Sequence, residues 1–491
     1  MKRQLHLNLF IHSRGHHEAS WRHSASSPLP LTDIRYYQDL AQRAEAAQFD
    51  SVFLADQLAL GGDVAQAPRT WLEPITVLAA MAVATSRVAL IATASTTYTE
   101  PFNLARQFAS IDHISRGRAA WNIVTSWLAT AAENYGGAGQ VSHADRYARG
   151  EEFMAVVKAL WDSWAADAVV DDRAAGVYAL HDRIRSIKHR GDFYTVAGPL
   201  NLPRCPQGWP VLVQAGSSDA GRRFAARHAD SVFTAHMAKA TAQEFYADLK
   251  SLAAAEGRAP EQMLILPGLS PMIAGTEAEA QRLAREVNEL TDPEVGRRRL
   301  SGRFGGYDFS HLPLDRPLSG ADFPDPASVE AARSRTEVIL NLVKRDKPTL
   351  RQLLGYLAGA RGHFATAGTP EQIAELIEDW FSDGAADGFN LMPPLLPVQL
   401  DAFSTEVIPI CSGAGCSAPN TSGQRCMSIT VCPGRRASLM IRTGRPSFAT
   451  TPPAYDRLAV QHLLSRIICR LFRCGLDQSG ARRVSDGLSI V

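Results

Sequence analysis

Residues 88–124, VALIATASTTYTEPFNLARQFASIDHISRGRAAWNIV, hold the pattern that decides the fold. Val88–Thr93 is a short apolar run typical of a strand, Pro101–Ser115 has helical periodicity, and Arg118–Val124 is a second strand-like run. A strand, a helix and a strand at this spacing predict a parallel pair, because the chain must cross back over the sheet before a parallel partner can form.

The same alternation extends outward in both directions. Six further strands are predicted at Leu5–Phe10, Ser51–Ala55, Val211–Gln214, Ser231–Thr234, Met263–Ile273 and Gly388–Leu391. Between them, helices are predicted at Ile34–Ala47, Glu73–Ala84, Ala144–Asp162, Ser218–His228, Ala240–Glu256, Thr276–Leu290 and from Pro370 to about Asp383. The last of these helices follows a capping box formed by Thr369 and Gln372. Eight strands that alternate with helices indicate the α/β class.

Two architectures fit this alternation, a (β/α)8 TIM barrel and a doubly wound open sheet. The open sheet usually carries a G-x-G-x-x-G turn after its first strand, and here Phe10 leads into IHSRG instead. We therefore predict the barrel. Two segments at about 165–210 and 292–345 break the rhythm with charges, Gly and Pro, and we expect them to be irregular surface insertions.

Composition excludes several classes of protein. The chain has 491 residues, 45% of them hydrophobic and 21% charged, and its net charge of +1 argues against a nucleic-acid binder. It contains no apolar run of about 18 residues, so we expect no membrane span. The start, MKRQLHLNLFIHSRG, is too polar after Phe10 for a secretory signal, which predicts a cytoplasmic protein.

In a barrel the active site lies at the C-terminal ends of the strands, so the residues that follow the predicted strands are the site candidates. They are His16, His17, Trp21, Asp56, Thr93, Ser95, Asn122, Thr125, His143, Tyr147, Ser217 and Ser218. His143 and Tyr147 are four residues apart at a helix start and so share one face. This set suits an organic ligand that has a phosphate and a flat ring.

Some of these signals have a second interpretation. The turn Gly216-Ser217-Ser218-Asp219 either caps a helix or holds a phosphate at the helix N-terminus. His16-His17-Glu18 could bind a metal, but no second histidine stands four residues on as in H-E-x-x-H, and we predict no metal site.

Six blocks of sequence, taken together, resemble a known family. They are GHHEASWRH, LADQLAL, IATASTTYTEPFNLARQFASIDHISRGRAAWNIVTS, HADRYARGEEFMAVVKALWDSW, PVLVQAGSSDAGRRFAARHADSVFTA and GTPEQIAELIEDWFSDGAADGFNLMPP. In this order they resemble the reduced-flavin monooxygenases of the bacterial-luciferase-like superfamily, in the branch that holds nitrilotriacetate monooxygenase component A, dibenzothiophene-sulfone monooxygenase and pristinamycin synthase. The resemblance runs from about Leu5 to Ile410 and implies a luciferase-like (β/α)8 barrel domain over residues 1–410.

The resemblance also implies roles for the candidates. Asp56 would lie beside the flavin ring, and Thr93, Ser95 and Thr125 would contact the flavin. His143 and Tyr147 would lie near its ribityl chain and phosphate, and Ser217 and Ser218 would form the phosphate-binding turn. His16, His17, Trp21 and Asn122 would face the substrate, which makes His16, His17 and Asn122 the catalytic candidates.

The mechanism that the resemblance implies has two components. A separate NAD(P)H:FMN reductase supplies FMNH2, O2 adds to the flavin to give a C4a-peroxyflavin, and a C–N or C–S centre of a small organic substrate is oxygenated. The family also implies a homodimer or homotetramer. Two alternatives remain open, an F420-dependent oxidoreductase of the same superfamily and a non-catalytic flavin-binding product.

The tail, residues 411–491, differs from the rest of the chain. It holds 11 Arg, 3 Asp and neither Lys nor Glu, a net charge of +8 that leaves −7 for residues 1–410, and it contains six of the seven Cys. Family members end in a segment like LQRRGLFRTEYEG. Synonymous codons for the stretch that begins CSGAGCSAPNTS, read one base earlier from Ile410, can encode LQRRGLFRTEYE. We hypothesise a frameshift near codon 410. A genuine basic tail is the alternative, and we expect it to be largely disordered.

Overall fold

Parallel strands close into an eight-stranded barrel in the computed structural model, which describes residues 3–60, 64–65, 68, 72–126, 129–136, 142–325, 333–360 and 362–412. In order around the ring, the strands are β1 (His6–Ile11), β2 (Ser51–Leu54), β3 (Ala89–Ser95), β4 (Ala119–Val124), β9 (Val211–Gln214), β10 (Ser231–Thr234), β11 (Leu264–Ile273) and β13 (Gly388–Leu391). The β10–β11 and β13–β1 pairings complete the ring. The predicted barrel is confirmed, and its eight strands are the eight that the sequence predicts.

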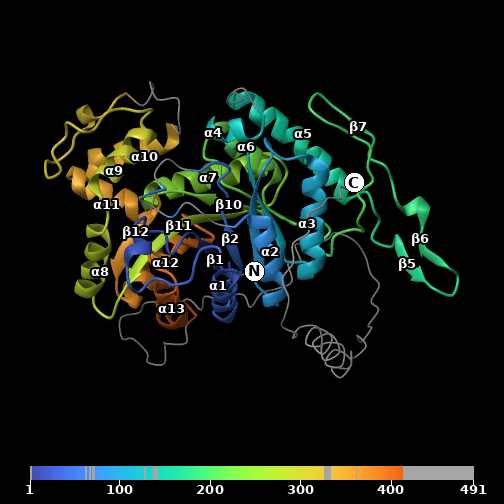
Figure 1. Ribbon diagram of the computed structural model, residues 1–491, viewed down its shortest axis with the longest axis horizontal. Coiled ribbons are helices and arrows are strands. Elements are labelled where there is room, and N and C mark those ends of the chain that lie inside the picture. The colour runs from blue at the N-terminus through green and yellow to red at the C-terminus, as the bar shows by residue number, and fades with distance from the viewer. Residues whose placement is uncertain are drawn as a thin grey trace, which may run out of the picture. The chain divides into compact units, whose positions relative to one another are not determined.

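Helices follow the strands and pack around the barrel (Figure 1). They are α1 (Ile34–Ala46), α2 (Pro74–Ala84), α3 (Pro101–Ser115), α5 (His143–Trp161), α6 (Asp219–His228), α7 (Lys239–Ala255), α8 (Glu277–Glu289) and α12 (Pro370–Ser382). The predicted capping box of α12 is present, because the Thr369 hydroxyl accepts from the Gln372 amide and the Gln372 side chain accepts from the Thr369 amide. Between strands and helices lies one large apolar core, in which Trp121, Trp161 and Phe153 are fully buried.

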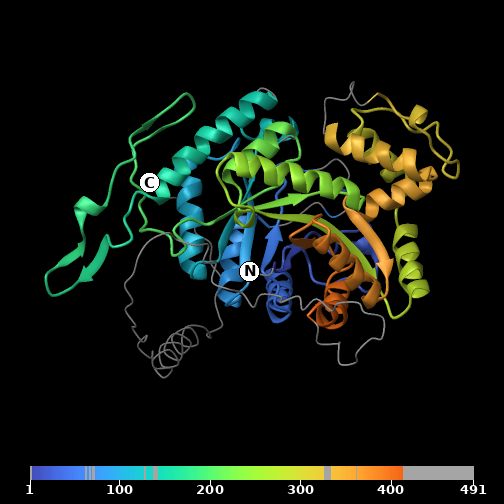
Figure 2. The same cartoon turned by 180° about the vertical axis from the view of Figure 1, so that it is seen from behind.

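The first insertion is a surface excursion, as predicted. It contains two short antiparallel ribbons, β5 (Val169–Asp172) with β6 (Val177–Ala179) and β7 (His189–Arg190) with β8 (Thr195–Val196), separated by the 3₁₀ turn η2 (His181–Arg183). Figures 1 and 2 show both ribbons away from the barrel strands. All four residues of β5 are exposed.

The second insertion is helical, so the expectation of an irregular segment over 292–345 is wrong. It forms α9 (Pro293–Arg303), the turn η4 (Gly320–Asp322) and α10 (Arg333–Asp346), and α11 (Leu350–Ala360) joins them, as Figure 1 shows. These elements share a separate apolar core that includes Phe304, Phe309, Val343 and Leu354. Helix α9 escaped prediction because Gly and consecutive Arg dominate it and it buries only Val295, Gly296 and Leu300.

A ninth parallel strand, β12 (Phe364–Gly368), was also missed. It pairs with Leu269–Ile273, the far half of β11, and so lies outside the ring of eight. Three of the five residues in its sequence, FATAG, are Ala or Gly, which are poor strand formers. The remaining elements are η1 (Ser20–Arg22), α4 (Ala129–Asn134), η3 (Pro260–Gln262), α13 (Val398–Ala402), the π-helical turn η6 (Phe403–Val407) and α14 (Ile408–Cys411).

The frameshift or basic tail hypothesised over residues 411–491 lies outside the described residues from 413 onward.

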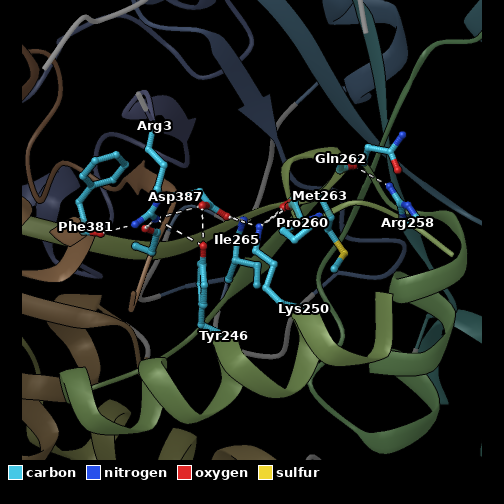
Figure 3. A network of polar contacts seen from close by, with 11 residues as sticks. Arg3, Tyr246, Lys250, Arg258, Pro260, Gln262, Met263, Ile265, Phe381 and Asp387 are labelled. Carbon is cyan, nitrogen blue, oxygen red and sulfur yellow. Dashed lines mark hydrogen bonds and ion pairs between the residues drawn. The ribbon is translucent and has the colours of Figure 1, made fainter. Parts of the chain in front are cut away.

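A buried carboxylate ties the barrel together at the N-terminal ends of its strands. Asp387 lies just before β13 and binds the Arg3 guanidinium at 3.1 Å, the Tyr246 hydroxyl at 2.8 Å and the Lys250 ammonium at 2.8 Å. The backbone amide of Ile265 donates to its second oxygen at 3.0 Å. Figure 3 shows these groups converging on Asp387 from three separate parts of the chain, the N-terminal segment, α7 and β11.

Candidate functional site

The candidate residues from the second to the fifth barrel strand lie on one arc of the barrel mouth. β2, β3, β4 and β9 are neighbours in that order, and the register pairs Thr93 with Asn122 and Asn122 with Val213. Because parallel strands end at the same edge, Asp56, Ser95 and Asn122 are brought to the same end of the barrel.

Asn122 carries an unsatisfied acceptor in this arc. Its amide nitrogen donates to the Thr93 hydroxyl at 2.8 Å, and both side chains are buried. Its amide oxygen is also buried and has no hydrogen-bond partner among the described residues. A buried acceptor without a partner is costly, so this oxygen is suited to accept a hydrogen bond from a bound ligand.

Ser95 organises the loop after β3. Its hydroxyl accepts from the Thr97 amide at 3.1 Å and the Tyr98 amide at 3.3 Å, and the Ser126 hydroxyl donates to it at 2.7 Å. The Thr97 hydroxyl donates in turn to the Thr125 carbonyl at 2.8 Å. These hydrogen bonds hold the loops after β3 and β4 together, and the Thr125 carbonyl is one of the groups that form them.

The carboxyl group of Asp56 has a raised pKa. Burial, with a smaller contribution from the negative charge of Glu73, raises the pKa of its carboxyl to about 6, although a hydrogen bond from the Gln57 amide at 2.8 Å acts in the opposite direction. A carboxyl with a raised pKa at the mouth of a barrel is a functional candidate, since it can hold a proton near neutral pH.

The start of α5 meets the start of α6. The His143 ring lies 3.5 Å (Nε2) from the Ser218 hydroxyl and 4.9 Å from the centre of the Tyr147 ring. Ser218 caps α6 by accepting from the Gly221 amide at 3.2 Å, so the capping interpretation of this turn is correct. The cap and a phosphate site are compatible, because Ser218 caps the helix while the neighbouring Ser217 lines a cavity.

Two glycines keep this meeting point open. A Cβ on Gly221 would lie 2.9 Å from the Tyr147 hydroxyl, and a Cβ on Gly216 would collide with the Gln214 side chain. The side-chain amide oxygen of Gln214 accepts from the Gly216 backbone amide at 2.7 Å, which fixes the turn. The result is a small polar cradle at the N-terminal end of a helix, an arrangement that favours anions.

The two histidines after β1 lie in different surroundings. His16 is buried, with Nε2 2.9 Å from the Phe10 carbonyl and its ring 5.3 Å from the His12 ring. Nε2 of His17 is 2.9 Å from the Asn288 side chain on α8, and its Nδ1 accepts from the Ala19 amide at 3.1 Å. His17 thus fastens the loop after β1 to α8, while Trp21 in the same loop is exposed.

A cavity of about 250 Å³ opens beside this arc, and sequence reasoning found only one of its residues. It is lined by Ala215, Ser217, Phe233, Thr234, Ala235, His236, Thr241, Arg303, Glu337, Ile339, Asn341, Gly362 and His363. His236 stands two residues after β10 and could have been found by the strand-end rule. Arg303, Glu337 and His363 could not, because they come from the misread insertion or precede the missed strand β12.

Two properties of the described residues concern a metal site and a membrane span. No group of three or more His, Cys, Asp and Glu among them lies close enough to hold a metal ion. None of the described helices is both long and apolar enough to cross a membrane.

Comparison with known proteins places the chain among monooxygenases. The pattern of the family described as "Luciferase-like monooxygenase" matches residues 9–387. N-acetyl-S-(2-succino)cysteine monooxygenase of Bacillus subtilis is 44% identical over 84% of this chain and 93% of its own. Nitrilotriacetate monooxygenase component A of Aminobacter aminovorans is 43% identical over 83% and 92%. The solved EDTA monooxygenase from Chelativorans sp. BNC1 superposes with a TM-score of 0.68 at 35% identity, covering 83% of this chain and 93% of that one.

Proposed function

Because this chain belongs to the luciferase-like monooxygenase family, we propose that it uses FMNH2 and O2 to oxygenate a small organic substrate at a C–S or C–N centre. The unsatisfied Asn122 oxygen carries this proposal. It is a buried acceptor in the C-terminal half of β4, where a ligand with N–H groups such as a flavin ring would satisfy it.

The residues of the mouth fit FMN in two ways. The cradle around Ser218, His143 and Tyr147, with Ser217 next along the chain, offers hydroxyl, imidazole and helix N-terminus to a phosphate. The arc of Asp56, Thr93 and Asn122 offers hydrogen-bonding groups to a ring. Reduced FMN, when bound, supplies the two electrons with which one oxygen atom of O2 enters the substrate and the other leaves as water.

The protein's own part is to position the ligands and to exclude water. Phe10 and Phe53 form an aromatic pair inside the barrel, with ring centres 4.4 Å apart, and provide an apolar floor below the polar arc. An apolar floor keeps bulk water from the reacting atoms, which limits wasteful release of hydrogen peroxide. Asp56 holds a proton at its carboxyl oxygen below a pH of about 6 and is an anion above it.

We propose a separate NAD(P)H:FMN reductase as the source of FMNH2. The relative from Aminobacter aminovorans is named as component A of its enzyme, which implies at least one further component. This chain also lacks a Gly-rich dinucleotide turn after its first strand. An F420-dependent oxidoreductase is not favoured, because the relatives compared are named as monooxygenases.

The substrate proposed is a small carboxylate that carries a thioether or an amine. N-acetyl-S-(2-succino)cysteine and nitrilotriacetate, which give two of the relatives their names, are both small molecules of this kind. The two compounds share carboxylate groups and differ in the heteroatom, so the carboxylate is the feature that we carry to this chain.

Substrate-dependent oxygen consumption tests the proposal. Purified protein would be mixed anaerobically with photoreduced FMN and then with O2, in the presence of either carboxylate. We expect product and less free hydrogen peroxide than without substrate. Oxygen consumption that yields only hydrogen peroxide with both compounds, together with no measurable FMN binding, would overturn the proposed function. Asn122→Ala should weaken FMN binding, while Asn134→Ala, an exposed position on α4, should not.

A further inference from the structure

The cavity described above lies where three parts of the chain meet. Ser217 comes from the turn before α6, Phe233 and His236 come from the end of β10, and Arg303 and Glu337 come from the second insertion. The cavity therefore joins the barrel mouth to α9 and α10, the helices that the sequence did not predict. Because Ser217 belongs to the turn of the proposed phosphate cradle, one edge of the cavity lies at that cradle.

The floor of the cavity is aromatic. His363 stacks on Phe233 with ring centres 4.8 Å apart and planes only 3° from parallel. Phe233 also lies 5.5 Å from Phe10 and 5.9 Å from Phe53, the rings that fill the barrel interior. The cavity thus rests on the same aromatic cluster as the polar arc.

The side of the cavity formed by the insertion is charged. Of the described residues that line it, Arg303 is the only Arg or Lys, and Glu337 is the only Asp or Glu. Glu337 and Asn341 are four residues apart on α10 and share a face. Arg303 ends α9 and is partly buried. A planar guanidinium in a partly enclosed cavity is well suited to a carboxylate, because it can donate two parallel hydrogen bonds.

His236 does not add a second positive charge. Burial lowers the pKa of its imidazole to about 4, and its two ring nitrogens lie 3.0 Å from the Thr234 hydroxyl and 3.2 Å from the Thr241 hydroxyl. It is therefore neutral near pH 7, so Arg303 is the positively charged side chain among the described residues that line the cavity.

We propose that this cavity is the substrate subsite and that Arg303 selects carboxylate-bearing substrates. The carboxylate binds the guanidinium, and the less polar part of the substrate, with its heteroatom, lies over Phe233 and His363 towards the barrel mouth. Glu337 limits the negative charge that the cavity accepts, and Asn341 provides an amide for a polar group. This proposal rests on the proposed function for its substrate class, but its binding test does not require turnover.

The test is equilibrium binding of N-acetyl-S-(2-succino)cysteine and nitrilotriacetate to the full chain by calorimetry, without FMN. Arg303→Gln should raise Kd at least tenfold for whichever compound binds, and Arg303→Lys should raise it less. Glu337→Gln should lower Kd, because a like charge is removed. Arg298→Gln is the matched control, since Arg298 is exposed on the same helix and does not line the cavity.

Kinetics then separate a selecting residue from a structural one. Arg303→Gln should raise KM for the carboxylate with a kcat within about threefold of the parent, and it should leave the melting temperature and the Kd for FMN unchanged. An unchanged Kd for the carboxylate in Arg303→Gln, or binding that is lost equally in Arg298→Gln, would overturn the proposal. Carboxylate binding that depends on Arg303 in a protein that oxygenates neither compound would contradict only the proposed function. Absence of carboxylate binding to the parent would contradict the subsite.

Discussion

At the scale of single residues, the raised pKa of Asp56 makes stability depend on pH. Its usual value is 3.8, and burial raises the pKa to about 6, so the folded protein holds this proton more tightly than the unfolded chain does. The group therefore favours folding fully below pH about 4, and that contribution is lost as the pH rises through about 6. Asp56→Asn should abolish this loss and gain on the order of 1 to 3 kcal/mol over the parent at pH 7.5.

Denaturant unfolding of parent and Asp56→Asn at a series of pH values from 4.5 to 7.5 measures this effect. The difference in free energy of unfolding should grow with pH and level off above about 6.5. The control is Asp192→Asn, because Asp192 is exposed and its substitution should leave the pH dependence as it was. A difference that stays constant over the whole range would show that Asp56 titrates normally.

Ser217 and Ser218 should separate ligand binding from helix capping. Ser217 lines the cavity, so Ser217→Ala should raise the Kd for FMN about tenfold, the value of one hydrogen bond to a charged group. The Kd for riboflavin should be unaffected, because riboflavin lacks the phosphate. Ser218→Ala should instead lower the free energy of unfolding by about 1 kcal/mol, because it removes the cap of α6. Equal losses for FMN and riboflavin in Ser217→Ala would contradict a phosphate role.

The sequence predicted residues of the barrel mouth correctly where they belong to a recognisable strand or directly follow one. Asp56 follows a short apolar strand, Thr93 and Asn122 lie in the C-terminal halves of the next two, and the register confirms that these strands are neighbours. Arg303 and Glu337 belong to no such pattern, because their position depends on how α9 and α10 fold back over the barrel. Hydrogen bonds between distant side chains could not be predicted from the sequence either. Only the structure shows that the His17 ring forms a hydrogen bond with the Asn288 side chain.

At the scale of elements, the same limit appears in the second insertion. The eight barrel strands were predictable because each is a compact apolar run between turns, such as Ser231–Thr234. α9 was not, because three of its eleven residues are buried and its helix is stabilised by packing on α11 rather than by its own pattern. β12 was not, because its pairing with the extended far half of β11 stabilises a sequence of low strand propensity.

The ribbon of β5 and β6 has apolar side chains on both faces and no cover in the described chain. Val170 is 44% exposed and Tyr178 is 61% exposed, and Val169 and Val177 beside them are also exposed. An isolated two-stranded ribbon is marginally stable in water, and clustered exposed apolar groups mark contact surfaces. We therefore expect this ribbon to contact a second copy of the chain in the homodimer or homotetramer that the family resemblance implies.

Light scattering coupled to gel filtration tests that contact. The pair of substitutions Val170→Asp and Tyr178→Asp should reduce the oligomer to a smaller species, because two charges would be buried without partners. Val83→Asp is the control, since Val83 is 75% exposed but stands alone on α2 and should leave the mass unchanged. A parent protein that is already monomeric, or a variant that keeps the parent mass, would refute the ribbon as an interface.

At the scale of the whole molecule, Asp387 links the first and last strands of the barrel to α7. Its carboxylate is almost fully buried and is bound to Arg3, Tyr246, Lys250 and the amide of Ile265. Removing it would leave the Ile265 amide without its acceptor and take the carboxylate away from the mostly buried Lys250 ammonium, while Arg3 and Lys250 would keep backbone carbonyls as partners. Asp387→Ala should therefore cost about 3 to 5 kcal/mol of the free energy of unfolding.

The control for Asp387 is Asp379→Ala, which breaks the exposed ion pair with Lys239 and should cost less than about 1 kcal/mol. Denaturant unfolding of both variants, monitored by tryptophan fluorescence, gives the two values. Similar small losses in both would mean that the network around Asp387 does not stabilise barrel closure.

The end of the described chain bears on the reading-frame hypothesis. Phe403, Val407 and Cys411 are buried at a helical spacing of four, so the last described turns present an apolar stripe to the core. Burial raises the pKa of the Cys411 thiol to about 12, so this side chain behaves as a small neutral apolar group. The alternative frame begins with Leu at this point of the chain, and Leu would continue the same stripe with a larger apolar side chain.

Resequencing the gene around codon 410 should therefore reveal one base more than the written frame contains, and the restored protein should continue as LQRRGLFRTEYE. We expect the restored protein to melt at a higher temperature than the chain as written, because the stripe of Phe403 and Val407 would be extended by apolar residues. Cys411→Leu in the written chain isolates the first of these changes. An intact written frame, with no gain in melting temperature on restoring the alternative frame, would favour the genuine basic tail, whose net charge of +8 would then be a property of the native protein.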